Sequence, residues 1–135
     1  IINQALSGVK KINLGSVYPT RDLTHVEDTC SGFLEIYKCN SLLGQATNIG
    51  MQHEINIGDL ANLIFNLMDT KVKIISDEER VRPDSSEVER LHCSNNKLIE
   101  ETSWQPNYDL VKGLEETIEW FRDSQKDYKT DIYHV

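Results

Sequence analysis

Residues 14–34 read LGSVYPTRDLTHVEDTCSGFL, and this stretch predicts the fold class of the chain. It opens at the end of a short apolar strand, which Gly15 terminates, and it continues through a turn. An extended segment at 23–26 then leads into a long helix, which we expect over residues 27–43. Apolar residues recur along this helix at the spacing of one helical face, namely at Val26, Cys30, Phe33, Leu34 and Tyr37. A strand, a turn and an amphipathic helix in this order indicate an α/β protein.

The alternation of strands and helices continues on both sides of this stretch. A cap-forming Asn56 precedes the clearest amphipathic helix, and Asp109 is placed to cap the last one. Trp104 and Trp120 are expected to anchor the core beside the last two helices. Further strands are predicted at 12–14, 46–49 and 72–75, and further helices at 1–8, 56–68, 95–101 and 109–121.

Charge and composition exclude several classes of partner. Fourteen Lys and Arg against 22 Asp and Glu give a net charge of -8, which disfavours nucleic acid as a partner. No apolar run approaches the roughly 20 residues that span a bilayer, and no signal-peptide pattern is present. We therefore expect a cytoplasmic protein with no membrane partner. The three cysteines lack a C-x-x-C spacing and the four histidines are scattered, so we expect no metal site.

Three passages resemble the C-terminal portion of the extended short-chain dehydrogenase/reductases, the family of NAD-dependent nucleotide-sugar epimerases and dehydratases. Residues 14–34 are similar to the family's R-D-aromatic-x-x-V-x-D stretch, with Leu23 in the aromatic position. Residues 46–64, with ATNIG and INIGDLANLI, resemble its N-I-G strand end and the helix that follows. Residues 82–121 resemble its R-P-G-D…L-G-W-x-P…L-x-x-G-L-x-x-T-I-x-W block. RP followed by SEVERL most resembles the UDP- or GDP-N-acetylglucosamine 4,6-dehydratases.

The resemblance implies a fold and a division of the chain. We expect the C-terminal end of a Rossmann-type doubly wound sheet with a small, mostly helical substrate-binding lobe, without the N-terminal NAD-binding half. Residues 1–122 would form the nucleotide-sugar-binding region, and residues 123–135 would form a polar tail. The sequence has no G-x-G-x-x-G and no Y-x-x-x-K. We therefore expect no cofactor to bind this chain alone, although NAD serves the family.

The resemblance also implies which residues bind ligand. Arg21 and Arg82 would hold the diphosphate of a UDP- or GDP-linked sugar, since a guanidinium makes paired bonds to phosphate oxygens. Glu87 would accept from the ribose hydroxyls, or else it is a solvated acid. Backbone contacts with the base are expected at Leu14, Gly15 and Ser16.

A structural interpretation of both arginines remains open. Arg21 could pair with Asp22 or Asp28, and Arg82 with the acidic run at 77–79, as surface ion pairs of little energetic consequence. No catalytic residue is expected in this chain.

Two hypotheses of different classes follow for the function. The chain is the substrate-binding segment of a nucleotide-sugar 4,6-dehydratase or epimerase, inactive alone and completed by a partner chain with the NAD-binding half. Alternatively, it is a stand-alone binding or oligomerisation module, or a non-functional remnant, derived from such an enzyme. Whether the chain is an enzyme is left open. In the family, the helix at 27–43 and the strand at 46–49 pack against the dinucleotide domain. We expect their apolar face, with Phe33, Leu34, Tyr37 and Ile49, to mediate a homodimer here; alternatively, the 1–8 helix or the polar tail covers it within one chain.

Overall fold

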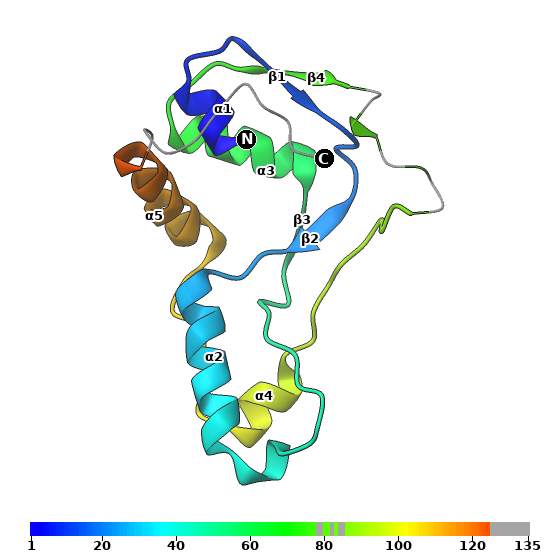
Figure 1. Cartoon of the computed structure of the whole chain (residues 1–135), viewed down its shortest axis with the longest axis vertical. Helices are drawn as coiled ribbons and strands as arrows, with labels where there is room; N and C mark the ends of the chain where they lie inside the picture. Colours follow the sequence, from blue (N-terminus) through cyan, green and yellow to red (C-terminus); the bar gives the residue numbers. More distant parts are fainter. Residues whose placement is uncertain (78–79, 82, 84–85, 125–135) are drawn as a thin grey trace. The chain divides into compact units, whose positions relative to one another are not determined.

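The computed structural model describes residues 1–77, 80–81, 83 and 86–124 (Figure 1). The chain divides into two compact units, each described by itself. Unit one contains residues 1–18, 57–87 and those from 114 onward, and unit two contains residues 19–56 and 88–113. Helix α5 (Leu110–Asp123) begins in unit two and continues in unit one. Among the described residues, no helix combines the length and apolar character needed to cross a bilayer.

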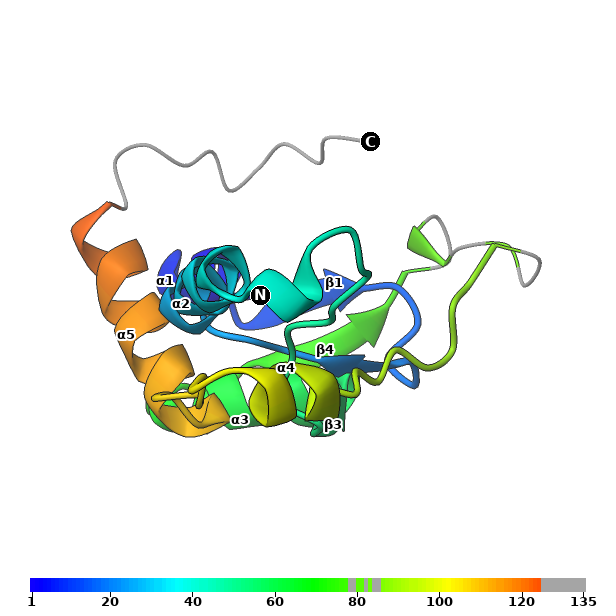
Figure 2. The same ribbon diagram turned by 90° about the horizontal axis from the view of Figure 1, so that it is seen from below.

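Unit one contains a pair of parallel strands. Strand β1 (Lys11–Leu14) pairs with β4 (Lys73–Ser76), with Ile12 opposite Ile74, and the two arrows run side by side in Figures 1 and 2. Helix α1 (Ile2–Leu6) precedes β1, and helix α3 (Ile57–Leu67) precedes β4. Parallel strands need a crossover segment between them, and α3 lies in the connection from β1 to β4. Unit one therefore supplies the α/β part of the fold.

Helix α3 confirms the clearest sequence prediction. Its apolar residues repeat at helical spacing, and the repeat places them on one face. That face is buried at Leu60, Ala61, Ile64, Phe65 and Met68. Together with Ile12 and Ile118, these side chains make up most of the apolar core of unit one.

Unit two is built around an antiparallel strand pair. Strand β2 (Thr20–Asp22) pairs with β3 (Glu54–Asn56), with Arg21 opposite Ile55. Helix α2 (Val26–Lys38) follows β2, a short 3-10 helix η1 (Asn40–Leu42) follows α2, and helix α4 (Asn96–Glu101) comes later in the chain. The apolar side chains buried in this unit are fewer, and they include Leu42, Leu98 and Trp104.

Two secondary-structure predictions in unit two are wrong. The helix expected over 27–43 ends at Lys38, because Cys39 takes an extended backbone conformation before η1 begins. The strand expected over 46–49 does not form. Side chains bond backbone carbonyls at both ends of this stretch: that of Ala46 accepts from Lys97 Nζ at 3.0 Å, and that of Gly50, the residue after it, accepts from Asn95 Nδ2 at 2.6 Å.

The predicted burial of the aromatic and apolar side chains is confirmed for some of them and wrong for others. Trp104 is 2% exposed, as expected, but Trp120 is 53% exposed and is not a core residue. Phe33, Leu34 and Tyr37 are exposed on α2, as the sequence predicts. Ile49 does not join them, because its side chain packs into the space that Gly32 leaves beside its Cα.

Candidate ligand-binding site

The predicted ligand residues belong to both units. Arg21 lies on β2 in unit two. Arg82 lies outside the described residues. The remaining predicted residues lie in unit one. Leu14 ends β1, Gly15 and Ser16 follow it, and Glu87 is the last residue of the 57–87 segment.

Arg21 is held by neighbouring backbone. Its Nη1 donates to the carbonyl oxygen of Thr20 at 2.7 Å and to that of Val88 at 2.8 Å. Both acceptors are neutral, so these bonds orient the guanidinium. A short strand fixes the Cα of Arg21, and the two carbonyls fix the end of its side chain. An oriented guanidinium is able to make paired bonds to an anionic group.

The next residue, Asp22, holds two other parts of unit two on β2. Its Oδ1 accepts from the backbone N–H of Met51 at 2.9 Å, and its Oδ2 accepts from that of Cys93 at 3.1 Å. Gly50 lies directly against Cys93, and a Cβ at this position would overlap the cysteine side chain. Burial, and after it the Asp22 carboxylate, raises the pKa of the Cys93 thiol, so this thiol stays protonated at neutral pH.

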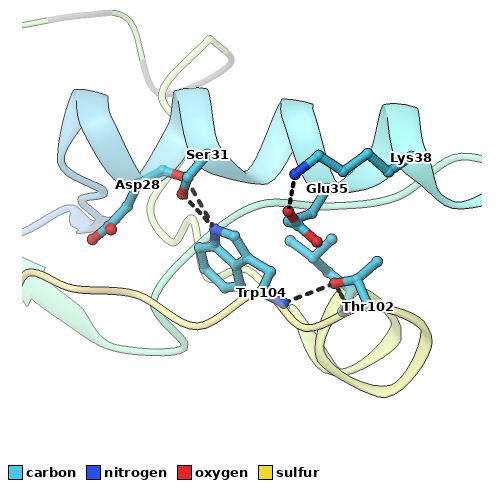
Figure 3. A network of polar contacts seen from close by, with 7 residues as sticks. Asp28, Ser31, Glu35, Lys38, Thr102 and Trp104 are labelled. Carbon is cyan, nitrogen blue, oxygen red and sulfur yellow. Dashed lines mark hydrogen bonds and ion pairs between the residues drawn. The ribbon is translucent and has the colours of Figure 1, made fainter.

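Asp28 has the same role at the start of α2. The residue is fully buried, and its two carboxylate oxygens accept from the backbone N–H groups of Asn107, at 2.8 Å, and Tyr108, at 3.1 Å. Figure 3 shows the indole of Trp104 beneath α2, where its Nε1 donates to the carbonyl of Asp28 and to Ser31 Oγ. Both motif aspartates therefore serve the architecture: each carboxylate satisfies two backbone donors.

A set of polar side chains that sequence reasoning missed lies beside Arg21. Glu54 on β3 forms an ion pair with Arg90, whose Nη2 lies 2.7 Å from Oε1 and whose Nε lies 2.9 Å from both carboxylate oxygens. Thr20 Oγ1 donates to Glu54 Oε2 at 2.7 Å. The bonds from Arg90 and then Thr20 lower the pKa of Glu54 to about 2. The residues are far apart in sequence, and no motif connects them.

In unit one, the predicted base-contacting residues lie at the carboxyl end of β1. Gly15 abuts the carbonyl group of Arg80 so closely that a Cβ would overlap it. The carbonyl of Leu14 accepts from the N–H of Asp77 at 2.8 Å, and Arg80 Nε donates to Asp77 Oδ2 at 3.0 Å. Gly15 thus allows two chain segments to approach each other at this edge. In open α/β sheets, ligands bind outside the carboxyl ends of the strands.

In the part of the chain that the structure describes, no group of three or more His, Cys, Asp or Glu residues is gathered closely enough to hold a metal ion. His25 instead caps α2 and stacks on Tyr108, with ring centroids 3.8 Å apart.

Known proteins share this fold. dTDP-glucose 4,6-dehydratase from Bacillus anthracis str. Ames, solved in complex with NAD, has a TM-score of 0.76 and 26% identity, over 93% of this chain and 38% of its own. UDP-glucose 4-epimerase from Thermotoga maritima, solved with UDP-glucose, has a TM-score of 0.74 and 22% identity, over 91% of this chain and 38% of its own. The structure is thus an α/β fragment with a parallel strand pair that matches part of the Rossmann-type epimerase/dehydratase fold.

The sequence comparison gives the family. The pattern of the family described as GDP-mannose 4,6 dehydratase matches residues 1–117. UDP-N-acetyl-alpha-D-glucosaminuronate decarboxylase of Bacillus cytotoxicus is 30% identical over 93% of this chain and 40% of its own length. The chain belongs to the GDP-mannose 4,6 dehydratase family of NAD-dependent nucleotide-sugar enzymes. It spans about two fifths of the length of the relatives that it matches.

Proposed function

We propose that this chain is the C-terminal, nucleotide-sugar-binding part of an NAD-dependent nucleotide-sugar dehydratase or epimerase, and that Arg21 binds the diphosphate of the ligand. Family membership over residues 1–117 supports the proposal. A further support is the similar fold of an epimerase solved with UDP-glucose.

The observation that carries the proposal is the setting of Arg21. A diphosphate is recognised best by a planar guanidinium held in one orientation, because two parallel N–H groups then meet two phosphate oxygens. The bonds from Arg21 Nη1 to the carbonyls of Thr20 and Val88 supply such an orientation. Asp22 and Asp28, the acids considered as ion-pair partners of Arg21, accept from backbone amides, and the ion-pair interpretation of Arg21 stays an alternative.

The role of this chain would be to bind and orient the substrate. In the relatives NAD supplies the redox chemistry, and a dinucleotide site needs a glycine-rich turn between a strand and a helix N-terminus. Here β1 is followed by Gly15 and then by β2, and the next helix starts only at Val26. The residues that follow β1 therefore do not fit NAD. We expect no NAD binding in a fluorescence titration of the chain alone.

Isothermal titration with UDP and GDP tests the proposal, with UMP as the ligand that lacks the second phosphate. Arg21→Ala should weaken UDP or GDP binding by about 2–5 kcal/mol, the range for removing one partner of a hydrogen-bonded charge pair. Arg21→Lys should recover part of the loss, because an ammonium provides charge without the planar fork. Arg122→Ala is the matched control, because it removes an exposed arginine of α5 that pairs with Glu119.

The resemblance carries the same role to Arg82, so Arg82→Ala should weaken binding over the same range. Binding of both alanine variants with wild-type affinity would make the diphosphate assignment wrong. A folded wild-type chain that binds neither UDP nor GDP would favour the alternative of a stand-alone module or a remnant. The preference for N-acetylglucosamine-type sugars and the cytoplasmic location stay predictions.

A further inference from the structure

The two faces of strand β2 hold different chemistry. Successive side chains of a strand point to opposite faces, so Thr20 and Asp22 share one face and Arg21 belongs to the other. On the Thr20 face, the Thr20 hydroxyl meets the Glu54 carboxylate, which in turn holds the Arg90 guanidinium. Three side chains from three chain segments are thus linked across one face of β2.

The segment that contains Arg90 also forms backbone hydrogen bonds with β2. Residues 88–91, which we call the 88–91 segment, run parallel to β2 with Arg90 opposite Thr20. The N–H of Thr20 donates to the carbonyl of Glu89 at 2.8 Å, and the N–H of Leu91 donates to the carbonyl of Thr20 at 3.1 Å. Among the described residues one isolated bridge joins the two segments, and the ion pair of Arg90 with Glu54 adds a side-chain contact to it.

The 88–91 segment supplies an atom that Arg21 needs. The carbonyl of Val88 accepts from Arg21 Nη1 at 2.8 Å. We propose that Glu54 and Arg90 are positioning residues for Arg21: their ion pair fastens the 88–91 segment to the paired strands β2 and β3, and the Val88 carbonyl then orients the guanidinium. The inference rests on the proposed function for its link to ligand binding, and on the geometry alone for its link to Arg21.

The ion pair is well formed for this purpose. The Arg90 guanidinium meets the carboxylate through both Nε and Nη2, a paired geometry that restricts rotation more than a single contact does. Thr20 adds a third bond to the same carboxylate. Because the Arg90 side chain is 67% exposed, water and salt screen the pair, and we expect an effect of about fivefold on any equilibrium it controls.

The first experiment needs no ligand. Nitrogen-15 NMR measures the rotation of the Arg21 guanidinium about its Nε–Cζ bond, and hydrogen exchange measures the opening of the Leu91 amide. The charge reversals Glu54→Arg and Arg90→Glu, made singly, should speed both processes by about fivefold. The double reversal should restore both, since the pair re-forms with opposite polarity and a hydroxyl such as that of Thr20 can accept as well as donate.

A matched control comes from α5. Glu119 and Arg122 form an ion pair of the same chemistry, three residues apart on the helix. Reversing that pair, singly or together, should leave Arg21 rotation and Leu91 exchange unchanged. A purely structural role for Glu54 and Arg90 would lower the urea midpoint or speed Leu91 exchange without changing Arg21 rotation. Either that result or no change in both measurements would overturn the inference.

The second experiment connects the inference to the ligand. In titrations with UDP and GDP, each single reversal should raise Kd by about fivefold, and the double reversal should return it toward the wild-type value. If Arg21→Ala weakens binding but the reversals do not, the positioning role is wrong and the proposed function stands. If the wild-type chain binds neither nucleotide, the proposed function fails, and the NMR result alone decides whether the pair positions Arg21.

Discussion

Unit one and unit two bury different kinds of side chain. In unit one the buried set is apolar and comes largely from α3, with Ile64 and Phe65 each less than 5% exposed. Unit two holds the buried polar residues of the described chain, Asp28 and Asn95. Asp28 accepts from the backbone of a distant segment, and Asn95 donates to the backbone of one. An apolar core tolerates small changes of shape, whereas a buried carboxylate that satisfies two amides does not tolerate its own removal. Unit two, which holds Arg21, should therefore be the more sensitive to single polar substitutions.

The largest expected effect tests this sensitivity directly. Asp28→Ala leaves the N–H groups of Asn107 and Tyr108 without their acceptor, and each unsatisfied buried donor is costly. We expect a loss of about 2–5 kcal/mol in the free energy of unfolding, measured by urea denaturation. Asp123→Ala, at the exposed end of α5, is the control and should change stability by less than about 0.5 kcal/mol. Equal effects of the two substitutions would remove the basis of the comparison.

A second prediction contrasts α2 with α3. The apolar face of α3 is buried, but that of α2 is exposed, with Phe33 at 64% and Tyr37 at 83%. The homodimer expected from the sequence would use this α2 face. Phe33→Glu should then weaken self-association by about 2 kcal/mol, the effect of removing a central aromatic from an interface. Light scattering at tens of micromolar measures it, and a monomer mass for the wild-type chain would make the homodimer prediction wrong.

A third, smaller effect concerns apolar packing. Ile64→Val removes one methylene group from the core of unit one and should lower the free energy of unfolding by about 1 kcal/mol. The same substitution at Ile99 on α4, where the side chain is 38% exposed, should have an effect of less than about 0.5 kcal/mol. Similar losses at both positions would show that unit two depends on apolar burial as much as unit one does.

The smallest expected effect is a dependence of stability on pH. The pKa of Glu54 is lowered from 4.5 to about 2, first by its bond to Arg90 and then by that to Thr20. The stabilisation is therefore complete above pH 4.5 and is lost as the pH falls through 2. Glu54→Gln should reduce the loss in the free energy of unfolding between pH 4.5 and pH 2. In an Arg90→Ala background the same substitution should have a smaller effect on that loss. Denaturation curves at a series of pH values test it; parallel curves for wild type and Glu54→Gln would contradict it.

The apolar half of this comparison could be predicted from the sequence. Helical spacing located α3, and β-branched residues located β4. The Asp109 cap is confirmed by the bond from the Lys112 N–H to its Oδ1 at 2.8 Å. These features depend on neighbours in the sequence, so a local pattern records them.

The polar half could not be predicted in the same way. The sequence offers Asp28 only as a possible ion-pair partner of Arg21, whereas its observed partners, Asn107 and Tyr108, lie 79 and 80 positions away. Glu54 and Arg90 lie 36 positions apart and belong to no motif. The sequence predicts a strand at residues 46–49. The side chains that bond backbone carbonyls there come from a distant segment, and such bonds leave no periodic signal in the sequence. Long-range polar contacts of single residues are absent from any local pattern.

The interrupted course of unit two has a consequence for how the chain reaches its native state. Its two segments, residues 19–56 and 88–113, are separated by a long stretch of unit one. Closing such a loop has an entropic cost before any contact compensates for it, so helix α3 in the intervening stretch, whose contacts are local, can form first. We therefore expect the contact between the Val88 carbonyl and the Arg21 guanidinium to form late in folding.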